Sequence, residues 1–249
     1  MPNQEIIFGI HAIQALLNAH SDCVIQLYID EKRQDKRIQS LLGMARDNKV
    51  AMQFSHRDEL DKLSHGANHQ GVVARCLMPQ AKDESYLEYL LAHNNAPFLL
   101  VLDGVQDPHN LGACLRTADA TGVNAVIIPK DRSVSLTSTV VKVASGAAFT
   151  VPLVSVTNLS RTIRQMQAAG VWFVGTDGNA DQTLYDLTLT GSIAIVLGAE
   201  GSGLRRLTKE LCDFLVRLPM LGSVESLNVS VATGICLYEA LRQRSLPIG

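Results

Sequence analysis

This sequence has no long apolar run and no paired cysteines, and its first residues do not predict a leader peptide. The longest apolar stretches, such as Phe98–Leu102, are far too short to span a bilayer. The first residues show neither a basic region nor a small-residue cleavage site, so we expect a cytoplasmic protein with no membrane contact. The five cysteines are odd in number and scattered, without a CxxC pair or a Cys/His cluster at zinc spacing. We therefore expect free thiols in a reducing compartment and no metal.

The sequence also lacks an excess of positive charge. Its formal net charge is −2, which excludes binding to nucleic acid through bulk attraction. Any contact with RNA has to use local groups of cations. The candidates are Lys130 with Arg132, and Arg205, Arg206 and Lys209.

A chain of 249 residues is long enough for two domains, each with its own core. Helical and strand patterns alternate in residues 1–77, which predicts a small α/β domain. The expected elements are helices at 10–17, 34–48 and 57–63 and strands at 24–29, 50–54 and 72–77. Residues 78–96 open near Pro79 and end in Asn-Asn-Ala just before Pro97, which is typical of a linker with a helical turn or two.

Residues 97–249 repeat strand and helix more strongly. The expected strands are 98–102, 123–128, 151–156, 171–174, 193–197 and 214–218, and the expected helices are 111–121, 136–147, 158–169, 204–211 and 228–244. Several of the strands are continuous apolar runs, as in a parallel sheet covered on both faces. The pattern predicts an α/β domain.

Polar loops follow three of these strands, at the sheet edge where open α/β domains bind ligands. In the first loop Asp107-Pro108 signals a turn, Asn110 could cap the next helix, and Arg116 lies about two turns into it. Taken alone, Asn110 could be only a cap and Arg116 only part of a solvated helix face.

The second loop holds Gly198, Gly201 and Gly203 around Glu200. Its spacing is GxxGxG, so the GxGxxG dinucleotide fingerprint does not match. A carboxylate among glycines after a buried strand indicates a function, although it could be only a dipole partner for the next helix. The third loop runs from Leu218 through Asn228, and capping explains one of its polar residues but not all of them.

Together the three loops resemble the motifs of the SpoU (TrmH) class of SPOUT RNA ribose methyltransferases. The first is similar to N-x(5)-R, the second to G-x-E-G-x-G, and the third, Pro-Met-Leu-Gly followed by Ser-Leu-Asn-Val-Ser-Val-Ala, to the third motif of the class. The resemblance covers about 98–244. Upstream, the start FGIHAIQALL and the stretch NHQGVVA resemble the ribosomal-protein-like RNA-binding domain found in this class.

The resemblance implies a fold, a reaction and a set of site residues. The fold is a SPOUT-type parallel sheet with a C-terminal trefoil knot, and the assembly is a homodimer with its active site at the subunit interface. The reaction is methyl transfer from S-adenosylmethionine to the ribose 2′-hydroxyl of a guanosine in large-subunit (23S) ribosomal RNA. Matched positions imply these catalytic residues: Asn110, Arg116, Glu200, Ser226 and Asn228. They imply these cofactor-binding residues: Thr176, Gly198, Leu218, Met220 and Leu227.

Guanidinium stays protonated, so we expect Arg116 to grip the target phosphate bidentately, with Glu200 orienting it, and not to act as a base. Two other functions compete with methyl transfer: an RNA-binding protein without catalysis, and a NAD-binding α/β enzyme. The combination of Asn110, Arg116 and Glu200 argues against the first, and the glycine spacing argues against the second.

Overall fold

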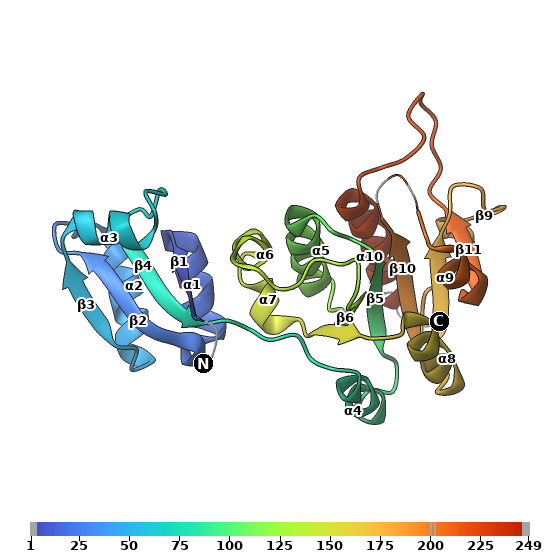
Figure 1. Cartoon of the computed structure of the whole chain (residues 1–249), viewed down its shortest axis with the longest axis horizontal. Helices are drawn as coiled ribbons and strands as arrows, with labels where there is room; N and C mark the ends of the chain where they lie inside the picture. The colour runs from blue at the N-terminus through green and yellow to red at the C-terminus, as the bar shows by residue number, and fades with distance from the viewer. Residues whose placement is uncertain (1–3, 200, 202, 246–249) are drawn as a thin grey trace.

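The computed structural model describes residues 4–199, 201 and 203–245, which form two sheets with their own helices (Figure 1). In the first sheet the strand order is β1-β4-β2-β3, with β2 and β3 parallel and the other neighbours antiparallel. Its elements are β1 (Gln4–Phe8), α1 (Ile10–Ala19), η1 (Ser21–Cys23), β2 (Val24–Asp30), α2 (Lys36–Asp47), β3 (Met52–Ser55), α3 (Arg57–Leu63) and β4 (Val72–Leu77).

The sequence patterns predicted every regular α-helix and β-strand of this unit except β1. In sequence β1 runs directly into the apolar face of α1, and its pairing joins distant residues, Gln4 opposite Leu77. No local pattern reveals such a pairing. The helix α2 illustrates the opposite case, because its start is local: Asp35 accepts hydrogen bonds from the backbone N–H groups of Arg37 (3.1 Å) and Ile38 (3.4 Å).

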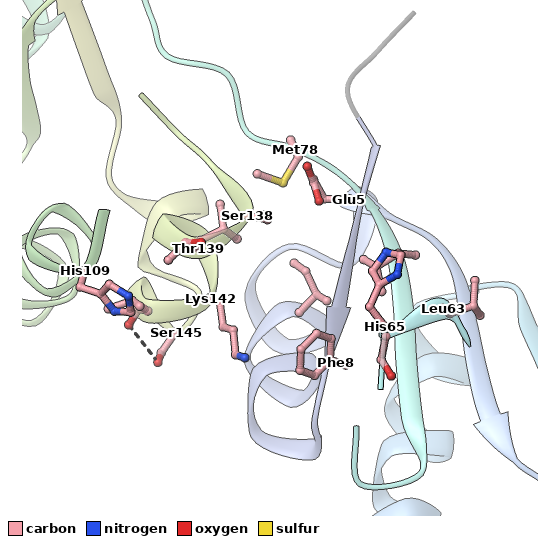
Figure 2. A pocket seen from close by; sticks show the side chains of 15 residues that line it. Glu5, Phe8, Leu63, His65, Met78, His109, Ser138, Thr139, Lys142 and Ser145 are labelled. Atoms are coloured by element: carbon pink, nitrogen blue, oxygen red, sulfur yellow. Dashed lines mark hydrogen bonds between the residues drawn. The ribbon is translucent and has the colours of Figure 1, made fainter. Parts of the chain in front are cut away.

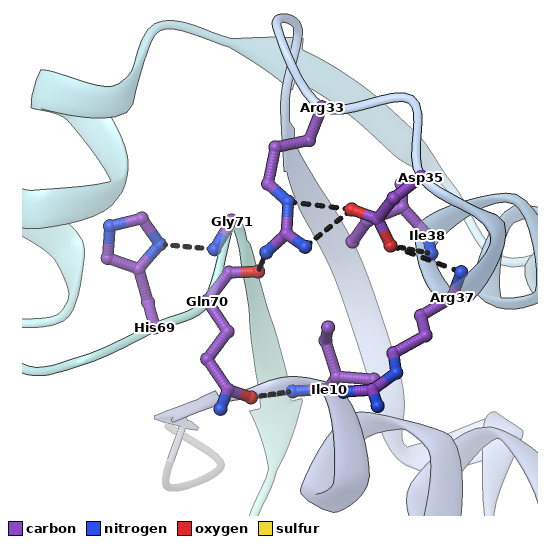
Figure 3. Close-up of polar contacts among 8 residues, drawn as sticks. All are labelled: Ile10, Arg33, Asp35, Arg37, Ile38, His69, Gln70 and Gly71. Atoms are coloured by element: carbon purple, nitrogen blue, oxygen red, sulfur yellow. Dashed lines mark hydrogen bonds and ion pairs between the residues drawn. The ribbon is translucent and has the colours of Figure 1, made fainter.

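The Asn-His-Gln-Gly stretch, residues 68–71, forms hydrogen bonds with three other segments at one end of the first sheet (Figure 3). The buried His69 accepts a hydrogen bond from the Gly71 N–H at Nδ1 (3.0 Å), so its Nε2–H donates to Asp61 Oδ1 (3.0 Å). Gln70 Oε1 accepts from the Ile10 N–H (3.0 Å), which satisfies one free donor of the α1 terminus. Arg33 in turn donates to the Gln70 carbonyl. These hydrogen bonds give the stretch a structural role within the first unit.

The second sheet has seven strands, all parallel to their neighbours, in the order β7-β6-β5-β10-β8-β11-β9. Its elements are β5 (Phe98–Asp103), α5 (Pro108–Ala120), β6 (Ala125–Pro129), α6 (Ser138–Ala144), α7 (Ala147–Thr150), β7 (Leu153–Val156), α8 (Leu159–Ala168), β8 (Trp172–Thr176), β9 (Gln182–Thr183), η2 (Leu184–Asp186), β10 (Ile193–Gly198), α9 (Arg206–Leu211), β11 (Phe214–Arg217) and α10 (Val229–Ser245). The predicted α/β architecture with a parallel sheet is confirmed, and β9 is an addition. The trefoil knot stays a prediction.

Both faces of this sheet are covered, so its strands are apolar throughout. In β5, Leu100 and Leu102 belong to the core shared with α5 and α10, whereas Leu99 and Val101 belong to the core under α8. The helix α4 (Ser85–His93) also packs into that second core, and it is longer than the helical turn or two that we expected there. Buried apolar side chains on one face of α4 account for this extra length.

The predicted helix 136–147 is interrupted. Ser145 adopts a left-handed conformation (φ 53°) and Gly146 has φ 100°, which separates α6 from α7. The two units of the chain meet at this break: a Cβ on Gly146 would lie 3.4 Å from that of Ala15, and His20 stacks on Phe149 with ring centroids 5.7 Å apart. Contacts with the first unit, which no local pattern encodes, accompany the break.

The last helix, α10, is the longest element. It buries one stripe against the sheet and α5, with Thr233, Cys236, Leu237 and Ala240 on that side. Within the part of the chain that the structure describes, neither α10 nor any other helix has the length and apolar character needed to cross a membrane.

We expect Gly112→Ala to destabilise the second unit. A Cβ there would lie 2.7 Å from Val143 Cβ and 2.9 Å from the Val140 carbonyl oxygen, so α5 and α6 must separate, at a cost of about 1–3 kcal/mol. The measurement is the urea midpoint reported by fluorescence of the single tryptophan, Trp172.

Gly43→Ala is the matched control, because Gly43 also lies inside a helix and its Cβ would have no neighbour within 4 Å. That substitution should leave the midpoint unchanged or raise it. Equal loss of stability in both variants would contradict the packing argument.

Candidate active site

The three motif loops meet at the carboxyl edge of the second sheet. There β5 lies between β6 and β10, so the connections leave the sheet in opposite directions at β5 and β10. Asp103 and Gly198, the last residues of these strands, are paired in register. Ligands of open parallel sheets bind at such a switch point.

The first loop brings Asn110 to this point in a role other than capping. The cap of α5 is Asp107, which accepts a hydrogen bond from the His109 N–H (2.8 Å), and Pro108 occupies the first turn. The expectation that Asn110 caps the helix is therefore wrong. Asn110 is buried within α5, and its Oδ1 accepts a hydrogen bond from Asn228 Nδ2 (3.0 Å). This amide pair joins the first motif to the third.

In the second loop the backbone crosses directly over the end of β10. A Cβ on Gly198 would lie 2.0 Å from the Gly203 carbonyl carbon, and Ala199 and Gly203 exchange two backbone hydrogen bonds (3.2 and 3.0 Å). Gly201 and Gly203 have φ values of 78° and 65°, which suit glycine. Backbone therefore occupies the space of a side chain at Gly198. The predicted catalytic residue Glu200 lies outside the described residues.

A buried ion pair holds the far end of this loop. The fully buried carboxylate of Asp103 accepts from the backbone N–H of Arg205 (3.2 Å) and from its Nε (2.6 Å). Lys209 on α9 pairs with Asp177, and this hydrogen-bonded cation lowers the pKa of the Asp177 carboxyl below its ordinary value. Both pairs tie α9 and its loop to strand ends.

Arg205, Arg206 and Lys209, which we named as candidate cations for RNA, all form ion pairs within the chain. Arg205 and Lys209 are held by carboxylates of the site, and Arg206 pairs with Glu210 one turn away on α9 (2.6 Å). Sequence analysis also missed Asp103 and Asp177. The signal that could have identified both residues is an aspartate at the end of a buried strand or directly after it.

A cavity of about 360 Å³ lies beside the crossing loop. Every predicted cofactor-binding residue lines it: Thr176, Gly198, Leu218, Met220 and Leu227. Ser226, predicted as catalytic, lines it too, with Gly203 and Glu225 of the motif loops, and sequence analysis missed Gly178 and Ala199. Leucine side chains with exposed glycine backbone and a few hydroxyl and carboxylate groups fit the adenine and ribose of an adenosyl cofactor.

Asn110 lines a second cavity of about 380 Å³, together with Gln106 and Asp107. Ala199 and Val229 line both cavities, so the two are neighbours. A group held in the first cavity would thus face a group held beside Asn110. This arrangement suits transfer between two bound molecules.

Arg116 stands apart from both cavities. It is exposed on α5, lines neither cavity, and makes no hydrogen bond or ion pair with the described residues. One chain therefore assembles Asn110, Ser226, Asn228 and the cofactor-binding residues, but does not bring Arg116 to them.

Comparison with known proteins agrees with this geometry. Residues 97–238 match the SpoU rRNA Methylase family, and residues 6–81 match the domain described as RNA 2′-O ribose methyltransferase substrate binding. The chain is 55% identical to the 23S rRNA (guanosine-2′-O-)-methyltransferase RlmB of Escherichia coli (strain K12), over 97% of this chain and 99% of that protein. It is 54% identical to the RlmB of Vibrio vulnificus (strain CMCP6), over 97% and 98%.

Solved structures show the same architecture. One RNA 2′-O ribose methyltransferase superposes with a TM-score of 0.79 at 28% identity, covering 98% of this chain and 90% of that one. The SpoU methyltransferase AviRb from Streptomyces viridochromogenes, crystallised with its cofactor AdoMet, gives 0.77 at 26% identity, covering 96% and 90%. By its sequence, its sheet and the loops at its switch point, the chain belongs to the SpoU rRNA methylase family.

Proposed function

We propose that this protein transfers a methyl group from S-adenosylmethionine to the ribose 2′-hydroxyl of a guanosine in 23S ribosomal RNA. The observation that carries the proposal is the pair of adjoining cavities at the switch point, one lined by the cofactor motif and one by Asn110. The near-full-length identity to RlmB proteins supports the choice of RNA and base.

Bound S-adenosylmethionine supplies an activated methyl group whose departure leaves a neutral thioether. The site therefore needs no group to stabilise a departing anion, and its main task is alignment of the ribose oxygen, which can lower the barrier by several kcal/mol. Asn110 and Asn228 hold each other's amide groups and are placed to hydrogen-bond the ribose. Glycine backbone and Leu218 and Leu227 hold the cofactor from its own side.

Arg116 enters this scheme through a second copy of the chain. We propose a homodimer in which Arg116 of one copy grips the phosphate of the target nucleotide at the site of the other, with Glu200 orienting it. Apolar side chains exposed on the third loop and on α10 support an interface there: Leu221, Val224, Val231 and Tyr238. Leu221 is 100% exposed in the single chain, and Val231 and Tyr238 lie two turns apart on one helix face.

The division of labour follows the two sheets. We propose that residues 1–77 select the RNA, that 78–96 connect, and that 97–249 catalyse in the cytoplasm. The two family matches, which fall on either side of the proposed linker for most of their length, support these bounds.

We expect S-adenosylhomocysteine, but not NAD, to bind the wild-type protein in calorimetry, and Asp103→Asn to weaken that binding roughly tenfold. The substitution keeps the shape of the side chain but removes the charge that holds Arg205, so the loop carrying Gly203 loosens.

Glu210→Gln is the control, since it breaks only the exposed pair with Arg206 and should leave affinity unchanged. Unaltered affinity in Asp103→Asn, with the protein still folded, would show that the ion pair does not organise the cofactor cavity.

We expect both Arg116→Ala and Arg116→Lys to abolish methylation while keeping affinity for S-adenosylhomocysteine, because a lysine cannot replace a bidentate fork. If Arg116 acts across the dimer, mixing Arg116→Ala with a cofactor-site variant such as Gly198→Val should restore roughly a quarter of the wild-type rate, since half the dimers carry one intact site.

The rate is measured as tritiated methyl incorporation into 23S rRNA, and dimer formation by light scattering. Mixed dimers that form but stay inactive would place Arg116 in the site of its own chain. A monomer with full activity would remove the dimer from the mechanism.

A further inference from the structure

A larger cavity lies between the two units of the protein, away from the cofactor-binding residues. Its volume is about 690 Å³, and it is bounded by β1, the end of α3 and the helix α6 (Figure 2). On its outer side β1 has no strand neighbour, because it is the edge of the first sheet. The volume lies within the usual range for ligand sites.

The centre of this cavity combines an aromatic ring with a cation. Lys142 on α6 places its Nζ 4.5 Å from the centroid of the Phe8 ring, which belongs to β1. Ser138, Thr139 and Ser145 add hydroxyl groups from the α6 side. Glu5 also lines the cavity, and Figure 2 shows it beside Met78 and apart from Lys142.

One turn of α5 contributes to both this cavity and the cavity beside Asn110, although the two cavities share no lining residue. His109 lines it on the α5 side, and the next residue, Asn110, lines the cavity beside the cofactor. On the opposite side it is lined by Phe8 and His65, which lie within the residues that match the substrate-binding domain. A strand of RNA held by the first unit would pass here on its way to Asn110.

We propose that this cavity is a subsite for an unpaired nucleotide of the RNA substrate, next to the one that is methylated. The inference rests on the proposed function. On binding, Lys142 turns from the Phe8 ring to the phosphate, the base stacks on the ring in its place, and the hydroxyl groups of α6 face the sugar. Unstacked bases bind proteins through aromatic side chains in this way, and a duplex cannot present a base to such a cavity.

The lining favours RNA over a protein partner. A docking helix or strand would use a uniformly apolar face, whereas this cavity sets the Phe8 ring, the Lys142 ammonium group, four hydroxyl groups, two imidazole rings and the Glu5 carboxylate among its aliphatic side chains. Three of the five cations suggested for RNA by charge alone, Arg205, Arg206 and Lys209, form ion pairs within the chain, whereas Lys142 faces the cavity itself and is placed to meet a phosphate there.

Two substitutions test the subsite, each measured on a 23S rRNA transcript by fluorescence anisotropy. Phe8→Leu keeps an apolar side chain but removes the ring, and should weaken binding roughly tenfold. Lys142→Ala should weaken it about fivefold and lower the slope of log affinity against log salt concentration by about 0.7, the value for one phosphate of a single strand. Phe8→Leu should leave that slope unchanged.

Lys82→Ala is the matched control, because it removes the same charge from an exposed residue of the segment between the units. Both test variants should raise KM for RNA while kcat and the affinity for S-adenosylhomocysteine stay at wild-type values. A transcript carrying 4-thiouridine next to the target should cross-link to peptides that contain Phe8 or the α6 residues.

The outcomes separate this inference from the proposed function. If the wild-type enzyme methylates the transcript but both variants bind it like Lys82→Ala, the subsite is wrong and the function stands. If the wild type binds the transcript and S-adenosylhomocysteine but transfers no methyl group, the proposed function fails, and the cross-link still decides the subsite. A cross-link confined to other surfaces overturns the subsite. Because Lys142 is exposed, its variant decides the question even if Phe8→Leu fails to fold.

Discussion

The close crossing of the chain over Gly198 is the constraint on which the site depends. Gly203 and the backbone of Leu204 occupy the space that any side chain at 198 would need. Asp103, at the end of the neighbouring strand, then fixes the exit of the loop through Arg205. Because of this crossing, the backbone at Gly198 and Gly203 lines the cofactor cavity, where it can contact an adenosyl group closely. Glycine at this position is thus imposed by the fold before any ligand is considered.

The second constraint joins the two sides of the reaction. Asn110 comes from the helix after β5, whereas Asn228 directly precedes the helix after β11, and their side-chain amides meet at 3.0 Å. Cys114 and Thr233 meet one turn further along the same two helices, at 3.3 Å. The packing of α5 against α10 therefore sets the distance between the cavity beside Asn110 and the cavity lined by the cofactor-binding residues. A shift between these helices would act on the reaction without touching either bound molecule.

The elements that the sequence pattern predicted are those whose cause is local. The apolar strands of the second sheet, the amphipathic helix α2 and the glycine-rich loop at 198–203 all carry their signal within a few residues. The features that escaped depend on distant contacts. The strand β1 exists through β4, the break at Ser145–Gly146 lies against α1, and the cap of α5 had to be chosen between Asp107 and Asn110 by the position of Asn228. The cofactor-binding residues were predicted from motif resemblance and lie around one cavity, and Arg116, which we assigned to the target phosphate and not to the cofactor, lies outside it.

The use of charge explains how a protein of net charge −2 can serve an RNA substrate. Arg205 and Lys209 form ion pairs with Asp103 and Asp177 and so hold loops of the site. Their charges therefore contribute little to the electrostatic potential in the solvent. Attraction over long range is weak as a result, and binding has to come from shape, stacking and a small number of phosphate contacts. Such contacts depend little on salt and strongly on whether the RNA can present unpaired nucleotides. A folded duplex gains nothing from them, whereas a loop does. We therefore expect the ion pairs that stabilise the cofactor loop also to favour targets in exposed, unpaired RNA.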